Sequence, residues 1–333
     1  MLHIAEDIRE RGGFLRRSDL LAIGYTDGGL KAALRYRLIF RVRHGWYSVP
    51  DAPDSAVRAV RVGGRLTGVA ALESYGLIVP RRRHIDIAVP RGACRLRRPA
   101  DRRARIQEQD GVRVRWIERP LAEREPESRW RVSLEEALVV ILQSEDRDIA
   151  VACCSAVMHA FRWSGKRMDA VFAMAPARAR AWRGLVNPLD EAHGETFARL
   201  WFGDAGIPWE PQPRVRGVGR LDGRVSPHVY VEVDGGQHDP AWTGESESTF
   251  HKDHVRRITL TARGATVLSF DYRQLYTAWP ECLAATRRAI ADDQALMAYR
   301  KRHPYRERSS PPRCPARQRP AKSPNENEGD PSE

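Results

Sequence analysis

The stretch GRLDGRVSPHVYVEVDGGQHD, residues 219–239, constrains the fold of this chain more than any other segment. Its centre, Ser226-Pro227-His228, predicts a three-residue hairpin loop, because proline suits turns and cannot serve a central strand ladder. The predicted cross-strand pairs are Val225 with Val229, Arg224 with Tyr230, Gly223 with Val231 and Asp222 with Glu232.

Side chains alternate between the two faces of a strand, which makes this register testable against the apolar pattern. One face receives Leu221, Val225, Val229, Val231 and Val233, and the other receives Asp222, Arg224, Tyr230, Glu232 and Asp234. A slip of one residue would expose the whole apolar set, so the pattern fixes the register.

The predicted pairing places Asp222 opposite Glu232, and like charges directly opposite each other destabilise a sheet. A cation between the two carboxylates would remove this cost. Three candidates follow from the sequence: Arg224, Arg220 or a bound divalent metal ion.

The charge balance of the chain points to an anionic partner. Its 333 residues include 56 Lys plus Arg against 43 Asp plus Glu, which gives a net charge of +13, and this length suffices for two or three domains. Such an excess favours nucleic acid or an anionic membrane surface, although an Arg-rich proteome would produce the same balance.

The cysteines and the apolar runs predict a cytoplasmic protein that does not enter a membrane. The five cysteines show no CxxC spacing, which argues for a reducing compartment. The N-terminus is charged from its sixth residue, unlike a signal peptide, and the longest apolar run, ALVVIL, is too short to span a bilayer.

Residues 1–50 predict three short helices followed by a basic hairpin around His44-Gly45, the order of a winged helix-turn-helix. In such a domain the third helix enters the major groove and the wing touches phosphates. The residues expected to contact DNA are Lys31, Arg35, Arg37, Arg41 and Arg43. The alternative is a basic amphipathic helix whose polar face is only solvated.

The segment GGFLRRSDLLAIGYTDGGLKAALRYRLIFRVRHGWYSVP resembles the N-terminal winged helix of AbiEi-type antitoxin and transcriptional-regulator proteins. Residues 55–180, with predicted strands in RRRHIDIAVP and VRVRWIERP and helices in SLEEALVVILQSED and DIAVACCSAVMHAF, resemble the middle part of the same proteins. No catalytic constellation is evident there, and the resemblance implies a scaffold.

Residues 187–298 predict a self-contained α/β unit, and residues 299–333 a basic, proline-rich tail too polar to fold. The expected fold class is α/β in the broad sense, an α+β multidomain chain. Within the unit, Glu195 on a helix, Asp222 on one strand and Glu232 on the next form an oxygen cluster of the kind that Mg²⁺ or Mn²⁺ prefers. Asp222 and Glu232 are the expected metal ligands.

The order of Glu195, AGIP, Asp222, VEVDGGQH, FHKDHVRR and GATVLSFDYRQL resembles endonuclease-like domains related to the very-short-patch-repair nucleases, within the PD-(D/E)XK superfamily. The resemblance implies that Asp222 and Glu232 hold the metal, and that Asp234, His238 and Asp253 complete the site. Arg256 would pair with Asp253 or with a phosphate.

Two departures from the superfamily pattern bear on turnover. Its lysine two residues after the Glu is Asp234 here, so activation of the water passes to another group, with His238 as the candidate and Lys252 behind it. The loop DPAWTGESES is also longer and more acidic than such domains often carry.

Two alternatives for this site stay open. The spacing of His238, His251 and His254 is compatible with zinc, although it is weaker than a Cys/His set. In the second alternative the hairpin is structural and Arg224 neutralises Asp222.

The sequence therefore predicts a Mg²⁺-dependent DNA endonuclease with a DNA-binding winged helix. The competing prediction is a regulator or antitoxin-like protein that binds DNA through the same winged helix and carries an inactive nuclease fold.

Overall fold

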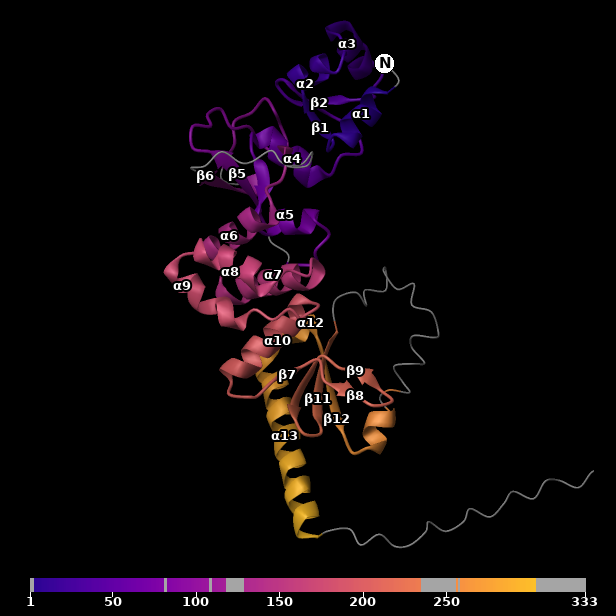
Figure 1. The fold of residues 1–333 in the computed structure, drawn as a ribbon, viewed down its shortest axis with the longest axis vertical. Coiled ribbons are helices and arrows are strands. Elements are labelled where there is room, and N and C mark those ends of the chain that lie inside the picture. The colour runs from indigo at the N-terminus through magenta and orange to yellow at the C-terminus, as the bar shows by residue number, and fades with distance from the viewer. Residues whose placement is uncertain are drawn as a thin grey trace, which may run out of the picture.

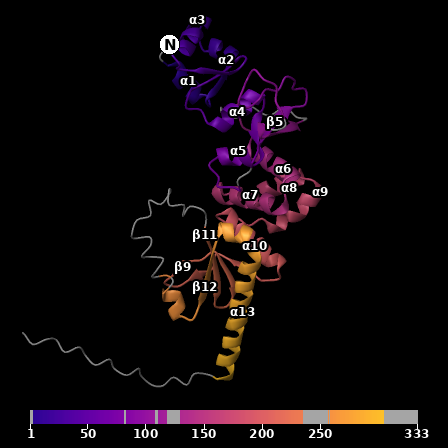
Figure 2. The ribbon, with the colours of Figure 1, turned by 180° about the vertical axis from the view of Figure 1, so that it is seen from behind.

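The computed structural model describes residues 3–80, 83–107, 110–117, 129–234, 256 and 258–303. The molecule is elongated, and its parts follow one another along the long axis in chain order, from the N-terminal helices to the long last helix (Figures 1 and 2). Several small mixed sheets alternate with helices, which confirms the predicted α/β class. No helix in the described ranges is both long and apolar enough to cross a membrane.

The first fifty residues contain the predicted helices and hairpin. The elements are α1 (Ile4–Glu10), β1 (Phe14–Arg16), α2 (Arg17–Ala22), α3 (Asp27–Arg35), β2 (Phe40–Arg43) and β3 (Trp46–Ser48). The strands form a sheet of order β1-β3-β2 over a small core. Thr26 begins α3, since its side chain accepts a hydrogen bond from the Gly29 amide at 3.1 Å.

The middle region pairs a three-stranded sheet with a helical layer. Its elements are α4 (Asp54–Val62), β4 (Arg65–Thr67), α5 (Gly68–Ser74), β5 (Ile85–Pro90), β6 (Val112–Ile117), α6 (Leu134–Ser144), α7 (Arg147–Ala160), α8 (Gly165–Ala173), α9 (Ala177–Arg180) and the 3₁₀ turn η3 (Ala181–Leu185). In the sheet β4-β5-β6, β5 and β6 run parallel. The two predicted strands and two predicted helices are all present.

The largest core joins the middle region to its neighbours on both sides. It extends from Phe14 and Val42 in the first fifty residues to Leu200 in the C-terminal unit. Phe14 packs against the ring of Trp130 at 6.2 Å between centroids, and the Trp130 indole N–H donates to the Gly12 carbonyl at 2.8 Å. The first fifty residues are therefore packed onto the middle region.

The C-terminal unit is a mixed sheet of order β12-β11-β10-β7 between helices. Its elements are α10 (His193–Asp204), β7 (Glu210–Pro211), β8 (Arg214–Val215), β9 (Gly219–Arg220), β10 (Gly223–Ser226), β11 (Val229–Asp234), β12 (Thr266–Asp271), α12 (Tyr272–Thr277) and α13 (Trp279–Arg302). Residues from α10, α12 and α13 share one core with β10, β11 and β12. The predicted tail, residues 299–333, begins too early, because α13 continues to Arg302; the residues from 304 onward lie outside the described residues.

The hairpin confirms two of the four predicted cross-strand pairs. Gly223 pairs with Val231 and Arg224 with Tyr230, as expected, and Val225, Val229, Val231 and Val233 are buried in one core. The loop differs, because Ser226 rather than Val225 pairs with Val229 and the ladder is irregular between Arg224 and Ser226. The irregularity shortens the loop to Pro227-His228.

The apolar pattern is wrong about the surroundings of two residues. Leu221 precedes β10 and packs with Tyr230 and Leu260 in a separate small cluster, rather than with the valines. The sequence also predicts a helix in STFHKDHVRRITLTARG with Val255, Ile258 and Leu260 facing inward. Ile258 is 64 % exposed, Leu260 is buried as predicted, and Val255 lies outside the described residues.

Candidate functional site

The first turn of α10 holds Glu195 in a buried position. Its side chain is only 8 % exposed, and Oε2 accepts a hydrogen bond from the Glu191 amide at 3.3 Å. The start of the helix is fixed by Asp190, which accepts from the Thr196 hydroxyl at 2.8 Å and forms an ion pair with Arg199 at 2.6 Å. Asp190 thus has its own counter-ion, and its role is structural.

Asp222 lies in the bend just before β10, and its carboxylate turns toward the neighbouring strand. Oδ2 accepts a hydrogen bond from the Val233 amide at 2.7 Å. The ladder begins at Gly223, so the predicted pair of Asp222 with Glu232 lies one position beyond its end. The bend instead directs Asp222 toward the end of β11.

Burial and like charge raise the pKa of both acids. Burial raises the pKa of Glu195 to about 8, and the nearby carboxyl of Asp222 adds to the increase. Burial also raises the pKa of Asp222, the Val233 hydrogen bond opposes this, and the carboxylates of Asp234 and Glu191 raise it further. Two buried carboxyls in a negative field are the arrangement that a divalent cation would relieve.

Neither arginine proposed from the sequence is the main counter-ion of Asp222. Arg224 forms an ion pair with Glu210, with Nε at 2.6 Å from Oε2, and Arg220 forms an ion pair with Glu191. Arg220 lowers the pKa of Asp222, but this effect is the smallest of those acting on it.

Glu232, by contrast, has a cation beside it. The Arg256 guanidinium lies 3.1 Å from Glu232 Oε1 and also donates to the Arg220 carbonyl at 2.7 Å. The sequence predicts a different partner for Arg256, namely Asp253 or a phosphate. Asp253, His238 and Lys252 lie outside the described residues, as do His251 and His254 of the zinc alternative.

The structure adds two acids that the sequence pattern does not single out. Glu191 acts on both Glu195 and Asp222, and Asp271 is the parallel-strand partner of Asp234 at the ends of β12 and β11. Parallel strands end at the same edge of a sheet. The sequence signal that could have identified Asp271 is therefore that two predicted parallel strands each end with an acidic residue. Asp271 also begins α12, where it accepts from the Arg273 amide at 2.6 Å.

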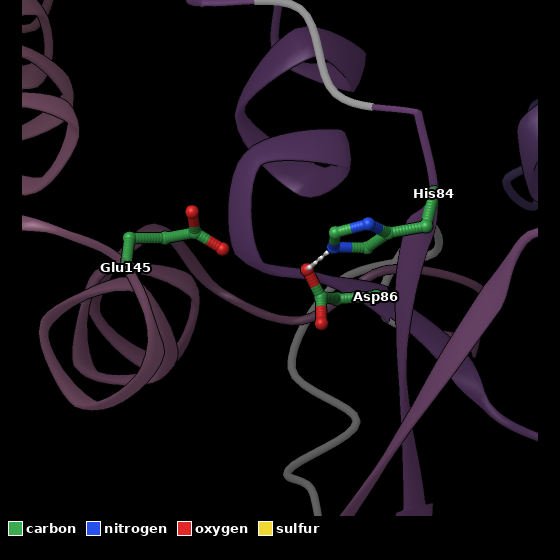
Figure 3. A group of neighbouring side chains, drawn as sticks. All are labelled: His84, Asp86 and Glu145. Carbon is green, nitrogen blue, oxygen red and sulfur yellow. Dashed lines mark ion pairs between the residues drawn. The ribbon is translucent and has the colours of Figure 1, made fainter.

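Among the described residues, Glu195, Asp222 and Glu232 do not form a group whose carboxylate oxygens all lie within 4.8 Å of one another. Such a group occurs instead in the middle region, where His84, Asp86 and Glu145 meet within that distance (Figure 3). Asp86 and Glu145 are buried, and His84 Nε2 lies 3.8 Å from Asp86 Oδ2.

This second group could hold a metal ion, yet two arginines already supply its positive charge. Arg113 lies 2.7 Å from Asp86 and 2.5 Å from Glu145, and Arg115 lies 2.7 Å from Asp86. Two carboxylates and two guanidinium groups balance without a metal, and Arg113 bridges both acids. The group is a buried ion-pair network that joins β5 and β6 to the end of α6.

The predicted DNA-contacting residues fall into two groups. Lys31, Arg35, Arg37 and Arg41 are exposed on α3, the turn after it and the wing. Arg43 is half-buried, its guanidinium lies against Gly63, and burial together with Arg97 lowers its pKa. The ladder between β2 and β3 is irregular between Arg41 and Arg43, so the two side chains do not share one environment.

Comparison with solved structures finds a likeness to the catalytic domain of the homing endonuclease I-Bth0305I, with 15 % sequence identity and a TM-score of 0.22. It covers 34 % of this chain and 97 % of that domain. A likeness at this level says nothing about activity. No family model and no curated protein matches the chain.

Proposed function

We propose that the chain is a metal-dependent DNA endonuclease, with phosphodiester hydrolysis in the C-terminal unit and DNA binding by the winged helix. The observation that supports this is that Glu195 is buried beside Asp222, and that neither acid has an arginine as its main counter-ion. The two acids lie near the edge of the sheet at which β11 ends with Asp234 and β12 ends with Asp271. Buried carboxyls that repel each other are costly unless a cation joins them.

The residues fit Mg²⁺ or Mn²⁺, since carboxylate oxygens are the ligands that these hard cations prefer. Asp222 and Glu232 would hold the metal and Glu195 would complete the cluster. A bound ion would supply a nucleophilic water and stabilise negative charge on the phosphate. His238 is the proposed proton acceptor, with Lys252 and Asp253 in support, and Asp234 keeps the field at the site negative.

Arg256 has a separate role in this proposal. Its guanidinium lies against the Glu232 carboxylate. A metal ion bound to Glu232 would take over the neutralisation of that carboxylate, and Arg256 could then pair with a phosphate of the substrate.

Two observations favour the alternative, a regulator or antitoxin-like protein that binds DNA without cleaving it. Arg256 neutralises Glu232, and Asp234 replaces the superfamily lysine. In that case the acidic cluster is structural and added metal changes nothing.

Plasmid cleavage distinguishes the two. The purified protein is incubated with supercoiled plasmid and single-stranded DNA in Mg²⁺, in Mn²⁺ and in chelator, alongside Asp222→Asn, Glu232→Gln and Glu210→Gln. Glu210 is the matched control, since it lies in the same sheet but pairs with Arg224. Nicking that needs metal and is lost only in the first two variants supports the nuclease. Tight DNA binding without cleavage under any condition supports the regulator.

A further inference from the structure

A second basic hairpin lies beside the wing, built from residues 96–106, which we call the arginine hairpin. Its two arms are joined by backbone hydrogen bonds from Arg98 N to the Ala104 carbonyl at 3.1 Å and from Ile106 N to the Leu96 carbonyl at 3.3 Å. Arg97 and Arg105 are antiparallel bridge partners. The segment is thus a formed structural element.

This element and the five residues before it concentrate positive charge on an accessible surface. Residues 91–105 contain seven arginines and one acid, Asp101. Arg95, Arg103 and Arg105 are exposed, whereas Arg98 forms an ion pair with Asp110 at 2.7 Å. Arg105 lies directly across the two arms from another arginine. Like charges opposite each other are unfavourable in isolation and become favourable against a polyanion.

The arginine hairpin is held against the wing by specific contacts. Arg102 donates to the Arg41 carbonyl at 3.0 Å. Arg61, on α4, donates to the Pro99 carbonyl at 2.7 Å and to the Val42 carbonyl at 3.5 Å, so one side chain bridges the two hairpins. The exposed cations of the arginine hairpin therefore continue the surface that begins at Arg41.

Gly63 makes this close approach possible. Its φ of +115° lies in the left-handed region, and a side chain there would collide with the Arg43 guanidinium and approach Leu96. The wing and the arginine hairpin thus meet over a position that only glycine fits.

We propose that the arginine hairpin is a second wing, which binds the phosphate backbone of duplex DNA next to the site of the winged helix. This inference rests on the DNA binding of the proposed function and extends it to the middle region. The described residues 91–107 present no exposed aromatic or other large apolar side chain, which a membrane-binding loop would use as an anchor.

The test removes charge from the arginine hairpin without disturbing its docking. The variant carries Arg95→Gln, Arg103→Gln and Arg105→Gln and leaves Arg61, Arg97 and Arg102 in place. A matched control carries Arg162→Gln, Lys166→Gln and Arg180→Gln, three exposed cations at the helical layer. The control reproduces the charge change. It also reproduces a replacement at a left-handed backbone position, since the φ of Arg162 is 51° and that of Arg95 is 57°.

The readout is fluorescence anisotropy of a labelled mixed-sequence duplex, titrated with the full-length proteins at several KCl concentrations. Each phosphate contact that is lost lowers the slope of log K against log salt by about one. We expect the slope of the hairpin variant to fall by roughly two to three, and that of the control to change by less than about one. Parent-like slopes for both variants, or equal losses in both, overturn the inference.

Further arms separate the possible failures. If the parent binds no DNA at all, the proposed function and this inference fail together. If Arg35→Ala with Arg41→Ala weakens binding and the hairpin variant does not, only the second wing fails. The inference is also overturned if the parent binds vesicles containing phosphatidylserine, or single-stranded RNA, in preference to duplex DNA, and the hairpin variant loses only that binding. Melting curves check folding, and Arg103→Gln alone replaces the triple variant if the latter unfolds.

Discussion

At the scale of single residues, the most informative feature is that Glu195 is buried next to an acid rather than a base. A group whose folded pKa is raised binds a proton that the unfolded chain releases. With an unfolded pKa of about 4.3 and a folded value of about 8, Glu195 stabilises the fold fully below the lower value. This stabilisation is lost as the pH rises through the folded pKa.

The corresponding prediction concerns Glu195→Gln. In chelator, the free energy of unfolding of the parent should decrease between about pH 5 and pH 8, and this decrease should become shallower in Glu195→Gln, because glutamine does not titrate. Urea unfolding at a series of pH values measures it, with Glu210→Gln as the control. An unchanged pH dependence in Glu195→Gln would mean that Glu195 titrates normally.

Arg43 shows how far a sequence pattern can predict the environment of a residue. Alternation along Phe40–Arg43 predicts that Arg41 and Arg43 share one exposed face, and the irregular ladder and the packing against Gly63 separate them. The cause is tertiary contact with residues outside the hairpin, Gly63 and Arg97, which alternation within a four-residue strand does not encode.

At the scale of secondary-structure elements, α3 and the wing carry the predicted DNA contacts. We expect Arg35→Ala with Arg41→Ala to lower affinity for duplex DNA and to reduce the salt slope by about two. Arg43 is left unchanged in this variant, because its replacement would also remove packing against Gly63. The slope is measured by anisotropy against the control of Lys166→Gln with Arg180→Gln. An unchanged slope would exclude this surface from DNA binding.

Some of these elements can be predicted from the sequence, and others cannot. Helix α6 and strand β11 have clear apolar periodicity, α7 has a long apolar run, and each lies where the sequence predicts it. The arginine hairpin has no apolar alternation, and Arg61 and Arg102 hold it against the β2–β3 hairpin through contacts that are distant in sequence. The bend at Asp222 likewise depends on the hydrogen bond to Val233, a contact with the neighbouring strand.

At the scale of the whole molecule, Trp130 joins the first fifty residues to the middle region. Trp130→Ala removes a buried ring that contacts Phe14 and a hydrogen bond to Gly12, and should lower stability by about 3–5 kcal/mol. Trp130→Phe keeps a ring and should cost roughly 1 kcal/mol for the lost hydrogen bond, plus a smaller packing loss. Because one core spans both regions, differential scanning calorimetry should show the two regions shifting together. A shift confined to a separate N-terminal transition would contradict this.

For the C-terminal residues 299–333 the sequence predicts a tail that is too polar to fold. Deletion of the residues from Ser309 onward removes no apolar periodicity, so the melting temperature should stay unchanged, although the loss of arginines should weaken non-specific DNA binding. Thermal melts of the full-length and truncated proteins test this. A clear decrease in melting temperature on truncation would show that the tail docks on the folded part.

Thermal melts of the parent and of Asp222→Asn, with and without Mg²⁺ or Mn²⁺, test whether Asp222 belongs to a metal site. Asparagine keeps an oxygen that can accept from the Val233 amide, so in chelator the variant should be as stable as the parent, or more stable by up to about 1 kcal/mol. Millimolar metal should raise the melting temperature of the parent and leave that of the variant unchanged, because a neutral amide is a poor substitute for a ligand carboxylate. Two results together would contradict the nuclease. The variant would be destabilised equally with and without metal, and metal would not change the melting temperature of the parent even with DNA present.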